Sequence, residues 1–122
     1  MTIRGIRGAI TVEKNTPDEI LSASRLLVQT ILDKNKLNAD DLVSITFTAT
    51  RDLDAVYPAR AVRDMGYINI PLMCMQEMQV KGSLAKCIRV LILCEIEKSK
   101  MEIVHVYLRE ARSLRPDWVK ED

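Results

Sequence analysis

Two charged residues in apolar surroundings are the first candidates for chemistry in this 122-residue sequence. Arg89 lies in the segment CIRVLILCE. On strand alternation its side chain shares a face with three apolar residues, Cys87, Leu91 and Leu93. A buried guanidinium without a partner costs several kcal/mol, so we expect an anion within its reach. Glu77, in the stretch MCMQEM, is one candidate.

This pair has two interpretations. Glu77 and Arg89 can form a structural salt bridge inside the core, or both can also face an anionic ligand. The pattern alone does not separate these alternatives.

The remaining arginines are spread along the chain. Arg4 and Arg7 flank Gly5 in a strand-like segment, so they should point to opposite faces. The segment RGIRG lacks the GxGxxG pattern and the lysine of a phosphate loop. The series Arg109, Arg112 and Arg115 is typical of a solvated surface.

The usual residues of covalent and metal chemistry lack companions. His105 is the one histidine, without a second histidine for a metal or a serine to activate. Cys74 is no convincing nucleophile. Arginines, one glutamate and a tyrosine suit a carboxylate-rich small molecule, so we expect neither metal nor cofactor.

Composition restricts the partners further. The formal net charge is +1, which predicts no attraction to nucleic acid or to an anionic membrane. The apolar run Val90 to Cys94 is too short to cross a bilayer, and Arg4 and Arg7 interrupt any signal-peptide pattern. Three cysteines without CxxC spacing predict reduced thiols. We therefore expect a cytoplasmic protein.

The first half of the chain shows clear boundaries. Residues 3–12 are rich in β-branched residues and are predicted as a strand, in which Gly5 and Gly8 indicate a close approach to the backbone. Thr16, Pro17 and Glu19 form the start of a helix that should end at Asn35.

The second half predicts four further strands and a short helix. Residues 43–50 alternate, with Val43, Ile45, Phe47 and Ala49 expected on the buried face. Residues 58–65 should be helical, 68–74 extended, 81–86 a turn or one helical turn, 87–96 a central strand apolar on both faces, and 104–108 the last strand. The charged tail should fray after Pro116. We predict one α+β domain over residues 1–122, a mixed sheet covered by helices on one side.

Six segments spread over the chain resemble the AroH-like, Bacillus-type class of chorismate mutases. They are IRGIRGAITVE, AVYPARAVR, CMQEM, CIRV, HVYLREA and LRPD. The resemblance implies a pseudo-α/β barrel, assembled as a homotrimer with active sites at the subunit interfaces. It also implies an isomerase that rearranges chorismate to prephenate without a cofactor, for aromatic amino acid biosynthesis.

The resemblance further implies roles for single residues. Arg7 and Tyr107 would bind substrate carboxylates, and Glu77 would meet the substrate hydroxyl with Cys74 close by. Arg89 would face the ether oxygen of the breaking bond. Arg89, Glu77 and Arg7 are thus the expected catalytic residues.

Other family positions would line the pocket. The neighbouring subunit would bring Tyr57, Ala59, Arg60 and Arg63, with Met73, Met75 and Gln76 also expected in the wall, while Leu114 and Arg115 would help to cover the site. Tyr57, Arg60 and Met73 depart from residues common in the family, which bears on affinity more than on the reaction.

Two rival interpretations belong to other classes. The same pocket could serve a non-catalytic trimeric protein that binds a small carboxylate. Alternatively, the chain could be purely structural, with Glu77 and Arg89 as a core salt bridge; it would then bind no bicyclic dicarboxylate analogue of the transition state.

Overall fold

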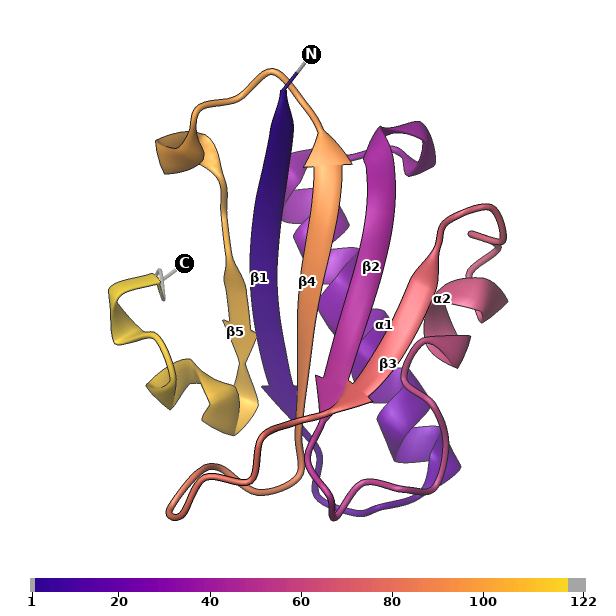
Figure 1. The fold of residues 1–122 in the computed structure, drawn as a ribbon, viewed down its shortest axis with the longest axis vertical. Helices are drawn as coiled ribbons and strands as arrows, with labels where there is room; N and C mark the ends of the chain where they lie inside the picture. Colours follow the sequence, from indigo (N-terminus) through magenta and orange to yellow (C-terminus); the bar gives the residue numbers. More distant parts are fainter. Residues whose placement is uncertain (1, 119–122) are drawn as a thin grey trace.

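The computed structural model describes residues 2–118, which form a five-stranded sheet with helices against one face (Figure 1). The elements follow in the order β1 (Ile3–Thr11), α1 (Pro17–Asn35), β2 (Leu42–Ala49), α2 (Arg60–Asp64), β3 (Leu72–Gln76), β4 (Cys87–Glu95) and β5 (Val106–Leu108). Short 3-10 helices span Ala39–Asp41, Lys100–Glu102, Arg109–Ser113 and Pro116–Trp118. This order of strands and helices confirms the prediction.

The sheet is mixed, as expected. Its strand order is β3-β2-β4-β1-β5, so β4 is central. Strand β4 runs antiparallel to both β1 and β2, whereas β1 pairs with β5 and β2 with β3 in parallel. Strand β5 therefore returns to the edge of the sheet, beside the first strand of the chain.

Helix α1 covers one face of the sheet (Figure 1). Its buried stripe, Ile20, Ala23, Leu27, Val28 and Ile31, packs against alternate residues of β1, β2 and β4. The helix begins where predicted, because the Thr16 side chain accepts a hydrogen bond from the Glu19 N–H at 3.3 Å. Helix α2 packs against α1.

Gly8 is where α1 crosses closest to β1. A Cβ atom at this position would lie 2.8 Å from the Ile31 Cδ1 and 3.0 Å from the Val106 carbonyl oxygen. The predicted close approach is thus confirmed at Gly8. At Gly5 a Cβ would make ordinary contacts, the nearest at 3.6 Å, so the prediction is wrong there.

Several boundaries differ from the predictions. In β2 the register shifts between Leu42 and Ser44, so Leu42 takes the buried place and Val43 is 38% exposed, not inward. The extended segment begins at Leu72 and runs to Gln76, later than expected. Helix α2 lacks residues 58, 59 and 65, and β5 lacks residues 104 and 105.

One face of the sheet stays uncovered in the single chain. Strand β4 was expected to be buried on both faces, yet Leu91 is 40% exposed. We call the face opposite α1 the open face. Its side chains on β4 are those of Cys87, Arg89, Leu91, Leu93 and Glu95.

The C-terminal segment packs against the edge of the sheet. Residues 116–118 form a 3-10 helix, and Trp118 packs on the cluster around Tyr107. The predicted fraying after Pro116 stays a prediction, and residues 119–122 lie outside the described range.

Candidate functional site

Strand register brings several predicted site residues into one row on the open face. Thr48 of β2 lies opposite Arg89 of β4, Arg89 opposite Ala9 of β1, and Ala9 beside Tyr107 of β5. Met75 of β3 continues the row at the other edge, because it pairs with Thr48. Residues that pair directly share a face, so this row crosses all five strands.

Arg7 belongs to the neighbouring row. It pairs with Leu91, two residues along β4 from Arg89 and on the same face. Arg4 lies on the other face, where its Nε donates to the Lys98 carbonyl oxygen at 2.6 Å. Arg7 is thus the one of the two that shares a face with Arg89, as one of them was predicted to do.

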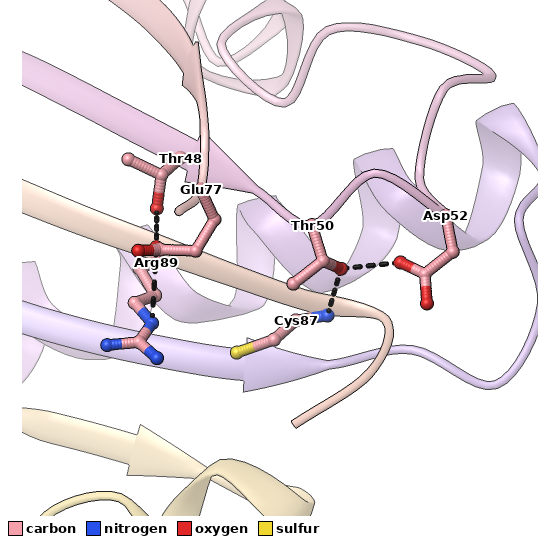
Figure 2. A network of polar contacts seen from close by, with 6 residues as sticks. All are labelled: Thr48, Thr50, Asp52, Glu77, Cys87 and Arg89. Atoms are coloured by element: carbon pink, nitrogen blue, oxygen red, sulfur yellow. Dashed lines mark hydrogen bonds and ion pairs between the residues drawn. The ribbon is translucent and has the colours of Figure 1, made fainter. Parts of the chain in front are cut away.

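Glu77 links two members of the first row. Its backbone N–H donates to the Ala49 carbonyl oxygen at 2.9 Å, which holds the residue just past the end of β3. Thr48 Oγ1 donates to Glu77 Oε2 at 2.5 Å, and the same oxygen lies 3.3 Å from Arg89 Nε (Figure 2). The predicted salt bridge therefore exists, but on the open face and not inside the core.

The ion pair leaves the guanidinium incompletely satisfied. The Arg89 and Glu77 side chains are 27% and 21% exposed. Although Arg89 Nε lies close to the carboxylate, it makes no hydrogen bond of good geometry within the described residues. A partly buried arginine in this state is suited to an additional anionic or ether oxygen partner.

Polar contacts at the start of β4 fix the position of Arg89. The Cys87 N–H donates to Thr50 Oγ1 at 3.0 Å, and Thr50 Oγ1 donates to Asp52 Oδ1 at 2.5 Å (Figure 2). Asp52 also accepts from the Lys86 N–H at 3.0 Å. These bonds attach β4 to the end of β2 two residues before Arg89.

The hydroxyl of Tyr107 is buried and is free to form a hydrogen bond with a ligand. The residue is 5% exposed, and its hydroxyl has no hydrogen-bond partner among the described residues. Burial raises the pKa of Tyr107, while the nearby charges of Arg7, Arg115 and Arg89 oppose this shift. A neutral phenol beside three arginines is suited to donate to a carboxylate.

The C-terminal segment places Arg115 near this group. The Arg115 guanidinium lies 3.3 Å from the centre of the Trp118 ring, and Trp118 stacks on His105 at 3.9 Å. Arg115 also donates twice to Asp117, at 3.0 and 2.8 Å. These hydrogen bonds lower the pKa of Asp117. Leu114 packs on the Tyr107 cluster.

His105 has a structural contact. Its Nδ1 accepts from the Arg7 backbone N–H at 2.9 Å, which continues the edge of the sheet next to β5. This agrees with the interpretation that His105 is neither a catalytic base nor a metal ligand. Within residues 2–118 there is also no group of three or more histidine, cysteine or carboxylate side chains that could hold a metal ion.

The other predicted residues lie around α2 and β3. Tyr57 is 75% exposed before α2, Arg60 and Arg63 are exposed on α2, and Ala59 is partly buried just before it. Arg60 pairs loosely with Asp64 at 3.8 Å. A cavity of about 550 Å³ lies beside this segment, and its lining includes Tyr57, Cys74, Met75 and Gln76.

Cys74 and Met73 lie on opposite faces of β3. Cys74 pairs with Phe47 and packs on the core, on the face of the sheet that carries the helices, whereas Met73 pairs with Thr46 on the open face. Within one chain, the Cys74 side chain is therefore on the face away from Arg89. Most of the predicted residues thus form two groups: Arg7, Glu77, Arg89, Tyr107, Leu114 and Arg115 in one, and Tyr57, Ala59, Arg60, Arg63, Cys74 and Gln76 in the other. Met73 and Met75 lie on the open face of β3, at the edge of the sheet.

The thiols are poor nucleophiles. All three cysteines are free. Burial raises the pKa of Cys74, and burial raises that of Cys87 even though Arg89 opposes the shift. At neutral pH both thiols are therefore mostly protonated.

The comparisons with known proteins decide the family. The model of the family described as chorismate mutase type I matches residues 3–118. The chain belongs to the chorismate mutase type I family. The resemblance stated from the sequence is thereby confirmed.

Named relatives and a solved structure agree with this membership. Chorismate mutase AroH of Bacillus subtilis (strain 168) is 47% identical over 118 residues, 96% of this chain and 93% of that protein. The protein of the same name from Thermus thermophilus is 45% identical, over 94% of this chain and 95% of its own length. The solved structure of a chorismate mutase from Clostridium thermocellum (Cth-682) has a TM-score of 0.89 and 49% identity, covering 90% of this chain and 98% of that one.

Membership in the chorismate mutase family confirms the expected fold and the isomerase class. It does not support the rival interpretation of a non-catalytic carboxylate-binding protein. No helix described in residues 2–118 is long and apolar enough to span a membrane.

Two contacts at the candidate site were missed from the sequence. Alternation placed Thr48 on the face opposite Phe47, but it gave no sign that its hydroxyl bonds Glu77, because Glu77 follows a different strand. The stacking of Trp118 on His105 was missed as well. Its signal, a tryptophan in a charged tail, was present in the sequence.

Proposed function

We propose that this chain rearranges chorismate to prephenate at a site shared by two subunits of a homotrimer. The observation that carries the proposal is the group on the open face: Arg89 beside Glu77, with Arg7 and the unpartnered Tyr107 hydroxyl nearby. The reaction is a pericyclic rearrangement in which one C–O bond breaks and one C–C bond forms. It needs no nucleophile, proton transfer or cofactor from the protein.

Substrate binding follows from the charges of this group. Arg7 and the Tyr107 hydroxyl take a carboxylate of the dianion, and Glu77 accepts a hydrogen bond from the substrate hydroxyl. Leu114 and Arg115 cover the site from the C-terminal segment. Holding the flexible substrate in its folded, reactive shape removes part of the entropic barrier.

Arg89 supplies the catalytic interaction. As the C–O bond lengthens, negative charge builds on the ether oxygen, and a guanidinium aimed there binds the transition state more strongly than the substrate. The same contact stabilises the bound substrate less, because the ether oxygen carries little charge before the C–O bond lengthens.

A second subunit completes the pocket. Tyr57, Ala59, Arg60, Arg63 and Met73, with the β3 residues Cys74, Met75 and Gln76, form the other part of the wall. The position of Tyr57, Arg60 and Arg63 around α2, away from Arg89 within one chain, supports a shared site. The exposed apolar side chains of Leu91, Met73 and Met75 on the open face support an assembly that covers them.

The decisive experiment mixes the pure protein with chorismate and follows the loss of its ultraviolet absorbance, with prephenate identified as the product. Sedimentation at assay concentrations gives the assembly in the same samples. Binding without turnover would return the protein to the carboxylate-binding alternative. A fully active monomer would contradict the shared site.

We assign the reaction to aromatic amino acid biosynthesis, where prephenate leads to phenylalanine and tyrosine. The cytoplasmic location expected from the sequence stays a prediction.

A further inference from the structure

Thr48 is the residue in direct contact with the site that has no assigned role. It lies opposite Arg89 in the antiparallel pair of β2 and β4, and its hydroxyl donates to Glu77 Oε2 at 2.5 Å (Figure 2). A carboxylate only accepts, so the direction of this bond is fixed. Short hydroxyl-to-carboxylate bonds are among the stronger ones in proteins.

The contacts of Glu77 fall on one oxygen. Oε2 receives the Thr48 hydroxyl and lies 3.3 Å from Arg89 Nε. Among the described residues, Oε1 makes no hydrogen bond. The carboxylate is therefore oriented, with one oxygen bound inside the protein and the other available.

The alternative geometry explains why this orientation matters. A carboxylate and a guanidinium that are free to rotate tend to form a bidentate pair, with two parallel N–H···O bonds. In that pair two N–H donors of Arg89 would bind Glu77 and would not be available to a substrate. The Thr48 hydroxyl competes for Oε2, and the contact that remains, through Nε, lacks hydrogen-bond geometry.

We infer that Thr48 is a positioning residue, which holds Glu77 so that Arg89 stays available to the ether oxygen. The inference rests on the proposed function, because it acts through two residues of the proposed site. Thr48 touches Glu77 and not the substrate. Its loss should therefore lower kcat more than it raises KM.

The test compares four variants with the parent enzyme. Thr48→Val removes the hydroxyl, keeps the side-chain volume and is well tolerated in a strand. Thr48→Ala also removes the hydroxyl, with a smaller side chain. Thr48→Ser retains a hydroxyl at this position. Thr46→Val is the matched control, because Thr46 lies on the same strand and face but pairs with Leu91. Each is assayed for kcat, KM and thermal midpoint.

We expect Thr48→Val and Thr48→Ala to lose about tenfold in kcat, the factor for one hydrogen bond to a charged group. KM should change by less than about threefold, and Thr48→Ser and Thr46→Val should stay within about twofold of the parent. If both hydroxyl-free variants keep the parent kcat, or if Thr48→Ser is as slow as they are, the inference is wrong. Absence of turnover in the parent would instead overturn the proposed function itself.

Discussion

At the scale of single residues, Arg89 shows how one side chain can serve both structure and chemistry. The sequence left open whether it was a core salt bridge or a site residue. Its ion pair with Glu77 exists, but it lies on the open face, and within residues 2–118 Nε has no hydrogen-bond partner. An arginine with only a structural role would be expected to form a bidentate pair with the carboxylate, with two parallel N–H···O bonds.

Removing Arg89 should remove the main stabilisation of the transition state. We expect Arg89→Ala to reduce kcat by at least about 10²–10³, the range for loss of one donor to a developing oxyanion. Arg89→Lys keeps the charge but not the planar fork, so we expect a folded protein that is still substantially slower. Stopped assays of prephenate at saturating chorismate measure both. A folded Arg89→Ala protein with nearly parental kcat would show that the ion pair is only structural.

The thiols give a second prediction at this scale. Burial raises the pKa of Cys87 and of Cys94, so less thiolate is present at any given pH than for a free cysteine. A disulfide reagent at pH 8 should therefore modify them much more slowly in the native protein than in urea. Mass spectrometry of the labelled peptides assigns each rate. Rapid native labelling of Cys87 with loss of activity would contradict its protonated, buried state.

At the scale of elements, the order and type of strands and helices followed from periodicity, capping residues and glycine. Thr16 and Pro17 marked the helix start, and apolar residues on both faces of β4 marked a central strand. Details that depend on pairing partners did not follow. The bulge at Val43 reverses which side chain is buried, and this depends on how β2 meets β4.

For the site too, the sequence indicated individual residues but not how the fold brings them together. Arg89 and Glu77 stood out because charge in apolar sequence is rare, and roles came only with the resemblance. Which residues share one face could be learned only from sheet order, since Met75, Thr48, Arg89 and Tyr107 come from four separate strands. Cys74, two residues after Leu72 and one before Met75, lies on the face of the sheet that carries the helices.

The C-terminal segment gives a prediction for one element. Trp118 connects Arg115 to His105 by ring contacts, so Trp118→Ala should loosen Arg115 and weaken substrate capture. We expect KM to rise by about two- to fivefold, since an exposed cation–π contact contributes roughly 0.5–1 kcal/mol, with kcat little changed. Trp118→Phe retains a ring and serves as the control.

The same segment offers a direct optical measurement. Trp118 is the single tryptophan of the sequence, so its emission reports the state of this segment without interference.

Deleting the residues after Pro116 should raise KM with only a small shift in thermal midpoint, because Trp118 packs at the edge and not in the main core. A large drop in the midpoint would mean that the segment is needed for folding.

At the scale of the whole molecule, the open face is the feature that one chain leaves unexplained. It combines exposed Met73, Met75 and Leu91 with the partly buried pair of Arg89 and Glu77. Soluble monomers rarely expose large connected apolar patches, so a covered face in an assembly is the expected state. In a closed ring of three copies, the open face of each subunit would contact a different surface of its neighbour.

A shared site can be tested by mixing two defective proteins. Arg89→Ala damages the group on the open face, and Arg63→Ala damages the group around α2. Each variant alone should be nearly inactive, because every site of the proposed homotrimer then carries one damaged group. In a mixed trimer, a site is intact when its open-face group comes from an Arg63→Ala chain and its α2 group from an Arg89→Ala chain.

Random assembly from equal amounts gives each of these conditions a chance of one half. The refolded mixture as a whole should therefore recover about one quarter of the parental activity per site after the two proteins are unfolded and refolded together. Native mass spectrometry of chains with different tags confirms that mixed trimers have formed. If they form and activity stays at the level of the separate variants, the two groups belong to one chain's own site. Recovery of activity near one quarter requires that neighbouring subunits complete each other's pocket, because neither variant contains an intact pair of groups.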